Sequence, residues 1–287
     1  VRGLELQSPM RMSLCAALLI AGRVGGMVAT IGAAIVASIV LLVLRNHLAR
    51  IVAPLPRVDM DASKVPADRA LDIDCVRSDD EGFTGGIVGV FRPRRNMLPA
   101  RWADVLSADG LRVARQRREI AVDSGSWYRG RWAALTFTWA GVVISALLVG
   151  ESAMGTAGGV ITLSFIFTIW SFAGLLVLPT LSRSGVTAID ERLRASGIPA
   201  AVLDDTVRAL DGLQDAEPER SALVESIFHP IPSVNNRLDG PRTHHRRGFW
   251  DVARSAIFLS ASGLGLLGRA VHCNCGRPAL WVYLPSD

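Results

Sequence analysis

The chain has 287 residues, half of them hydrophobic, and a formal net charge of +5. The hydrophobic residues gather in long blocks, which is typical of an integral membrane protein and excludes an ordinary water-soluble enzyme. The positive charge comes almost wholly from arginine, since Lys64 is the only lysine, and we attribute this bias to a GC-rich genome. The arginines are spread along the polar segments without interleaved aromatic residues, so we expect no nucleic-acid partner.

The first predicted membrane segment covers residues 1–50. Within it, residues 24–44 form a run without charge, which is long enough as a helix to cross about 30 Å of hydrocarbon. The preceding apolar run, residues 12–22, is too short to cross alone. It either extends the same helix into the membrane interface, with Arg23 reaching toward the headgroups, or folds back at the glycines of residues 22–26.

Residues 51–131 form a predicted polar part with strands and one helix that has a clear start signal. Residues 70–76 alternate between apolar and polar and predict a short strand, and residues 83–91 predict a second strand. Glycines in the second strand suggest a bulge or a close backbone approach. A helix is expected after Ser107, because serine is a favoured N-cap and Asp109 places a negative charge in the first turn.

Residues 132–182 predict a transmembrane hairpin. Its two spans are residues 132–150 and 156–181, and the connector between them carries an acidic residue and no arginine. Arginines flank both open ends of the hairpin. By the positive-inside rule, residues 45–131 and 183–248 lie in the cytoplasm. The N-terminus then lies outside if the first apolar block crosses the membrane once.

Three further segments complete the chain. Residues 183–248 predict a helical cytoplasmic part, and residues 249–271 predict a fourth membrane segment that is marginally long for a span. Residues 272–287 form an aromatic-rich tail expected at the membrane interface. We interpret Cys273 and Cys275, which stand in this tail, as free thiols rather than as metal ligands.

The helix that follows Ser107 contains the sequence Arg118-Glu119-Ile120-Ala121-Val122. Its spacing matches the His-Glu-x-x-His motif of zinc metalloproteases. In that motif two histidines at i and i+4 bind one metal ion, and the glutamate between them activates water. Here Arg118 and Val122 occupy the two ligand positions, and only Glu119 remains.

Other short segments accompany this motif in a fixed order. Strand 83–91 and then Met97-Leu98-Pro99 precede the helix; the hairpin, Val186 to Asp190, His229-Pro230 and Arg237-Leu238 follow it. This order resembles the integral-membrane gluzincin zinc metalloproteases, which include the heat-shock membrane protease, the prenyl-protein endopeptidase and the BlaR-type sensor proteases. The resemblance covers roughly residues 70–240.

The resemblance implies a mostly α-helical integral membrane protein with three to four transmembrane helices and a small α+β cytoplasmic metalloprotease-like domain. It places the third zinc ligand at Val186, and Asp190 and His229 also match family positions. An arginine repels a nearby divalent cation and valine offers no lone pair, so we expect no metal, no cofactor and no catalytic residue. Glu119 should instead form an ion pair with Arg118 or with another nearby arginine.

The resulting hypothesis is a pseudoenzyme. We expect a catalytically inactive, metalloprotease-like protein of the bacterial cytoplasmic (inner) membrane. It would contact lipid and other membrane protein subunits as a structural or accessory subunit of a larger assembly, by analogy a respiratory or photosynthetic one. The strand at 83–91 could pair with a strand of a partner. The alternative is an active membrane-bound metallopeptidase with atypical ligands such as Glu119, His229 and His244.

Overall fold

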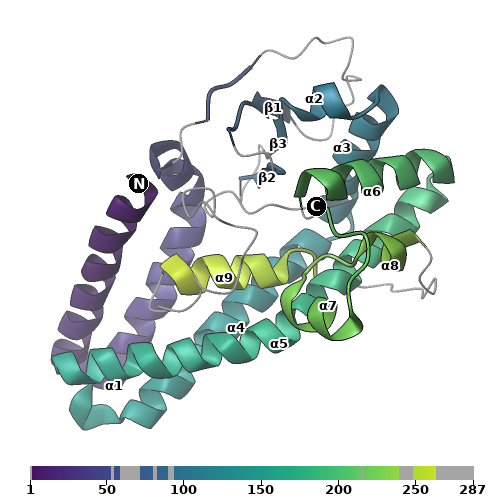
Figure 1. Cartoon of the computed structure of the whole chain (residues 1–287). Coiled ribbons are helices and arrows are strands. Elements are labelled where there is room, and N and C mark those ends of the chain that lie inside the picture. Colours follow the sequence, from purple (N-terminus) through teal and green to yellow (C-terminus); the bar gives the residue numbers. More distant parts are fainter. Residues whose placement is uncertain are drawn as a thin grey trace.

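The computed structural model describes residues 2–52, 55–58, 72–79, 83–89, 94–214, 216–238 and 248–262. The described part is mostly helical with one small sheet, as predicted (Figure 1). Within it, three helices are long and apolar enough to cross a membrane. They are α1 (Arg2–Val52), through its stretch Met12–Arg45, α4 (Ser126–Val149) and α5 (Ala157–Ala195).

Helix α1 bends sharply at Gly25 and Gly26, and Gly26 adopts a left-handed conformation with φ +60°. The two limbs lie side by side (Figure 1), because Leu18 of the first limb shares an apolar cluster with Ile31 and Ala34 of the second. The sequence allowed two arrangements for residues 12–22, and the structure has the one in which the chain folds back. The first apolar block is therefore not a single straight helix. The prediction that the N-terminus lies outside assumed a single crossing, so it no longer follows.

The bend of α1 is fastened to the connector of the predicted hairpin. The carboxylate of Glu151 accepts the backbone N–H of Met27 at 3.1 Å, and Arg23 Nε donates to the carbonyl of Gly155, also at 3.1 Å. The connector itself is a short 3-10 helix, η1 (Glu151–Ala153). The bend and the hairpin tip consequently lie at the same end of the molecule.

Helices α4 and α5 form the predicted hairpin. Helix α5 begins after Thr156, whose hydroxyl accepts the N–H of Gly159 at 2.9 Å, so the N-cap fixes where the second span starts. The helix continues past the predicted end of the span at residue 181. This continuation carries Val186 and Asp190 into the polar part of the molecule.

The sheet has three strands in the order β1-β3-β2. Strand β1 (Asp72–Val76) runs parallel to β3 (Arg95–Pro99), and β2 (Gly86–Val88) pairs antiparallel with β3. The strands expected at 70–76 and 83–91 are thus present, the second one shorter than predicted and at an edge. The central strand β3 was not predicted, because its residues show no apolar alternation.

Five helices pack around the sheet and the polar end of α5. They are α2 (Trp102–Val105), α3 (Ala108–Asp123), α6 (Ala200–Gln214), α7 (Ala222–Phe228) and α8 (Val234–Leu238). Helix α3 contacts α4, α5 and α6, and α7 contacts α5. The apolar stripe of α6, including Leu203, Val207 and Leu210, is buried. Helix α3 therefore joins the polar part to the membrane hairpin, together with the continuation of α5.

Helix α9 (Val252–Ser262) packs against α1, α4 and α5 (Figure 1). The backbone of Trp250, just before it, fits between α4 and α5 only because both helices have glycine there. A Cβ atom at Gly130 would lie 2.0 Å from the Trp250 carbonyl oxygen, and one at Gly185 would lie 2.7 Å from its Cα atom. The predicted segment 249–271 thus packs on the membrane helices over its described portion. Residues 263–287 lie outside the described residues.

Candidate functional site

The motif helix α3 begins as the sequence predicts. The Ser107 hydroxyl accepts the N–H of Gly110 at 3.0 Å. Its buried face includes two adjacent arginines, Arg117 and Arg118, both at or below 1% exposure. Burial of two long cationic side chains is costly unless each is well hydrogen-bonded, so their partners decide what this helix can do.

Arg118, where the resemblance would place the first zinc ligand, reaches into the sheet. Its Nη1 donates to Asn96 Oδ1 at 2.6 Å and to the Met97 carbonyl at 2.7 Å, and its Nη2 donates to the Thr84 carbonyl. The guanidinium carbon also lies 5.1 Å from the ring centre of Trp102, a cation–π distance. Arg118 thereby ties α3 to β3 and to the segment that leads into β2.

Val122 and Val186, which the resemblance assigns to the other two ligands, are associated with one apolar cluster. Val186 is 2% exposed within a core that also contains Ile87 and Trp127, and Val122 packs against the same core. The structure therefore places Val186 in an apolar cluster and packs the partly buried Val122 against the same cluster. No lone pair is offered by either side chain.

Glu119, where the resemblance would place the general base, forms an ion pair. Its carboxylate accepts Arg115 Nε at 2.8 Å, one helical turn earlier, and the two side chains are only 16% and 6% exposed. The expected pairing with a nearby arginine is present, and the partner is Arg115 rather than Arg118. The carboxylate is consequently held along the surface of its own helix.

Asp190, another residue that carries the resemblance, lies in a buried ionic cluster. It pairs with Arg117 of α3 and with Arg237 of α8, whose Nε and Nη2 lie 2.9 Å and 3.2 Å from its two carboxylate oxygens. Three elements distant in sequence are thus joined by one carboxylate. Sequence reasoning singled out Asp190 and Arg237 separately. It missed Arg117, whose only signal is its place beside Arg118.

His229 belongs to a second polar cluster, centred on Glu225. The Glu225 carboxylate accepts the N–H of Ser233 at 3.0 Å and Nδ2 of Asn236 at 2.9 Å, while Arg183 donates to the carbonyls of Glu225 and His229. Burial acts to raise the pKa of Glu225, but these hydrogen bonds and the charge of Arg183 outweigh it and hold the pKa below its usual range. Nothing in the sequence pattern marked Glu225.

In the part of the chain that the structure describes, no group of three or more His, Cys, Asp or Glu side chains is placed to hold a metal ion. The structure does not bring Glu119 and His229 into such a group. His244, the third residue of the alternative ligand set, lies outside the described residues, as do Cys273 and Cys275.

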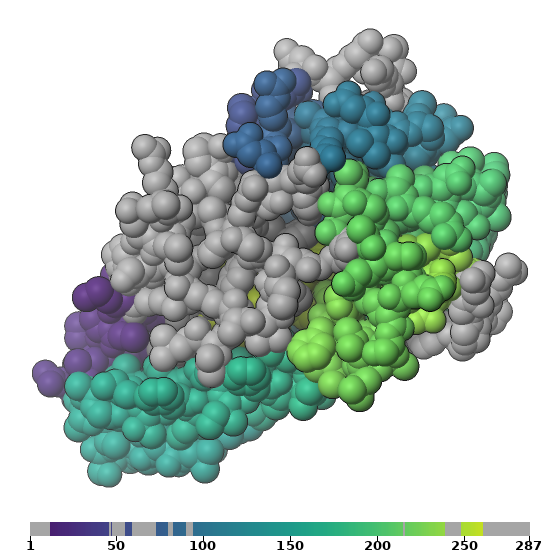
Figure 2. Space-filling model, in the orientation of Figure 1, coloured from purple at the N-terminus to yellow at the C-terminus, as the bar shows by residue number. Residues whose placement is uncertain are grey.

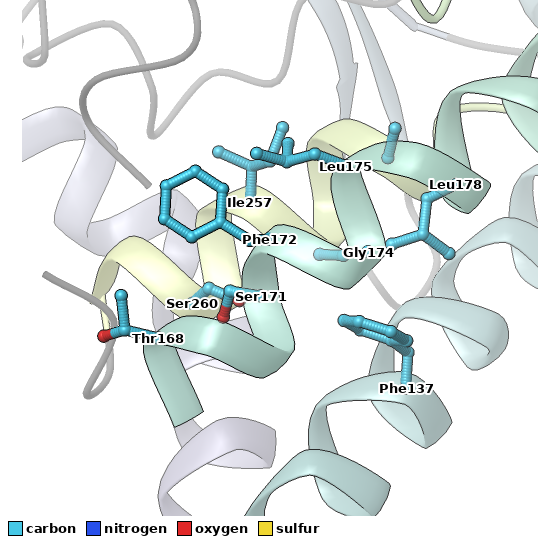
Figure 3. A pocket seen from close by; sticks show the side chains of 11 residues that line it. Phe137, Thr168, Ser171, Phe172, Gly174, Leu175, Leu178, Ile257 and Ser260 are labelled. Atoms are coloured by element: carbon cyan, nitrogen blue, oxygen red, sulfur yellow. The ribbon is translucent and has the colours of Figure 1, made fainter. Parts of the chain in front are cut away.

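A narrow cavity lies between α4, α5 and α9 (Figure 3). Its volume is about 20 Å³, and Phe137, Phe172 and Leu175 are among its mostly apolar lining residues. Two hydroxyls of the lining are already bonded within α5: Thr168 donates to Ser164 O and Ser171 to Phe167 O. The cavity has room for about one water molecule, and the described residues that line it carry hydroxyl groups but no acidic, basic or thiol side chain.

Neither a scan against models of protein families nor a search of curated proteins gives a match to this chain. The class of the protein therefore rests on its own features. It is a mostly helical, multi-pass membrane protein with a small α+β part, and its apolar helices contact lipid.

Proposed function

We propose that this chain is a catalytically inactive, metalloprotease-like protein that serves as a structural or accessory subunit of a larger membrane assembly. One observation carries the proposal: the Arg118 guanidinium occupies the space between α3 and the sheet and is held there by three oxygen acceptors. A guanidinium stays protonated under all physiological conditions. Arg118 therefore carries a permanent positive charge at a residue where the resemblance expects a zinc ligand, and such a charge would repel a divalent cation.

The neighbouring positions support the same conclusion. Val122 and Val186 contribute to an apolar core, so their side chains stabilise the fold by burial instead of by ligation. A general base must lie within hydrogen-bond reach of the proton that it removes, and Glu119 is engaged by Arg115. Each family position thus has a packing or ion-pairing role in this chain.

A role in assembly is proposed by analogy with degenerate membrane proteins that serve as accessory subunits. Within the described residues, β2 pairs with a strand on one side only, but Gly86 and Ile87 of this strand are buried. Proteins of respiratory or photosynthetic membranes are the partners that we propose by analogy.

We further propose the bacterial cytoplasmic membrane as the location, with the polar part in the cytoplasm. Because α1 folds back at Gly25 and Gly26, the limb before the bend runs back alongside the limb that crosses the membrane. The exposed residues Ser152 and Ser221 mark the two sides. Cysteine introduced at each should react with an impermeant maleimide from opposite sides of the membrane, compared with the unsubstituted chain; reaction from one side would refute the topology.

Zinc binding by restored ligands tests the inactive-protease proposal. The triple variant Arg118→His, Val122→His, Val186→Glu should bind one zinc ion per chain, whereas the unsubstituted chain should bind none. The matched control, Arg112→His with Gln116→His, places a histidine pair at the same spacing on α3 away from Val186 and should bind zinc more weakly. Stoichiometric zinc in the unsubstituted chain would favour the peptidase alternative, and a triple variant without zinc would refute the family relationship.

A further inference from the structure

Helix α7 exposes a compact apolar face. Leu223, Val224 and Phe228 are 72%, 39% and 46% exposed, and Ile227 between them is half-buried. At 100° per residue these four side chains fall within an arc of about 140°. Glu225, about 60° beyond Phe228 around the helix, is buried and hydrogen-bonded to α8. The side of α7 that carries Glu225 is thus fixed to the protein by polar contacts, and the adjoining side presents hydrocarbon.

The position of α7 is set by Arg183, which lies two residues beyond the apolar run 156–181 of α5. Its guanidinium donates to the carbonyls of Glu225, Ser226 and His229, and also to the Thr180 hydroxyl at 2.8 Å. These bonds hold the C-terminal half of α7 against α5 at the level where the span ends. Figure 1 shows α7 beside α5, and Figure 2 shows its green surface adjoining the teal surface of α5.

The lipid-facing surface of α5 reaches the same level. Leu176 and Val177 are each 58% exposed and lie about one turn before Thr180. An arginine at the end of a span places its guanidinium among the lipid headgroups. Since Arg183 binds α7 directly, the apolar face of α7 lies at the depth of the headgroups and the first acyl carbons.

We propose that α7 is an interfacial membrane anchor. Its face of Leu223, Val224, Ile227 and Phe228 inserts into the lipid at the end of α5 where the polar part begins. Amphipathic helices of this kind bury their apolar side about 5–10 Å into the headgroup–acyl boundary. Through Glu225 and α8, the anchor is linked to the Asp190 cluster, so it fixes the orientation of the α+β part relative to the membrane.

Site-specific ¹⁹F NMR tests the proposal on the full chain in phosphatidylethanolamine–phosphatidylglycerol vesicles. Trifluoromethyl-phenylalanine replaces Phe228 in one sample. It replaces Phe165, an exposed residue in the α5 span, in the lipid reference, and Ala201, exposed on α6, in the water reference. Broadening is measured with a lipid spin-labelled near its headgroup and with a soluble gadolinium chelate.

The signal at 228 should broaden with the spin-labelled lipid as the signal at 165 does, and should be protected from gadolinium relative to 201. Broadening by gadolinium to the extent seen at 201, without an effect of the labelled lipid, would overturn the proposal. Protection from both agents would overturn it as well, because protein would then cover the face. Unchanged near-ultraviolet circular dichroism establishes that each labelled chain is folded.

Discussion

Replacing Arg118 with methionine removes the guanidinium but keeps an unbranched apolar side chain. The Asn96 side-chain oxygen and the carbonyls of Met97 and Thr84 then lose a donor inside the protein. A buried acceptor left without a hydrogen bond costs about 1–3 kcal/mol. With the lower value for each of three acceptors, the attachment of α3 to the sheet weakens by about 3 kcal/mol.

Amide hydrogen exchange of the full chain in detergent measures this weakening where it occurs. At about 1.4 kcal/mol for each tenfold change, the opening equilibrium of the β2–β3 pair should rise about 100-fold, while exchange in the centre of α4 stays the same. The matched control is Arg112→Met on the exposed side of α3. Its contact with Asp109 is solvent-exposed and should change exchange by about twofold or less. Equal exchange of β2 and β3 in the two variants would refute the structural role of Arg118.

Three further variants test other contacts. Asp190→Asn should destabilise the chain by about 3–5 kcal/mol, because two buried arginines lose the carboxylate between them; thermal unfolding no different from that of Asp109→Asn would contradict this. The lowered pKa of Glu225 means that its stabilising effect is present at neutral pH and is lost as the pH falls from about 4.5 toward the folded-state value, so unfolding of Glu225→Gln should depend less on pH in that range. Gly185→Ala should cost about 1–3 kcal/mol by overpacking against the backbone of Trp250, whereas Gly212→Ala, with open space around the added methyl group, should stabilise α6 by up to about 1 kcal/mol. The reverse order of melting temperatures would disprove the packing argument.

The spans and the start of α3 could be predicted because each depends on local chemistry. The length of an apolar run decides whether a helix can cross a membrane, and a serine N-cap acts within one turn of the chain. The alternation of residues 70–76 likewise marked β1. In these segments the environment of each residue follows from its neighbours in sequence.

The features that sequence reasoning missed depend on contacts between distant segments. Strand β3 contains Asn96, which is fully buried and accepts a hydrogen bond from Arg118 of the distant helix α3. The fold-back of α1 requires the left-handed Gly26 and the carboxylate of Glu151; its glycines permitted a bend but did not demand one. The ion pair of Arg117 could not be predicted from the sequence, because its partner Asp190 is 73 residues away.

Native mass spectrometry of the tagged chain, released from its own membrane in mild detergent, tests the proposed function most directly, because one mass reports both bound metal and bound subunits. We predict that the chain appears in a complex with other membrane proteins at a fixed stoichiometry and that its own mass includes no zinc. A chain that appears alone and carries one zinc ion would contradict the proposal.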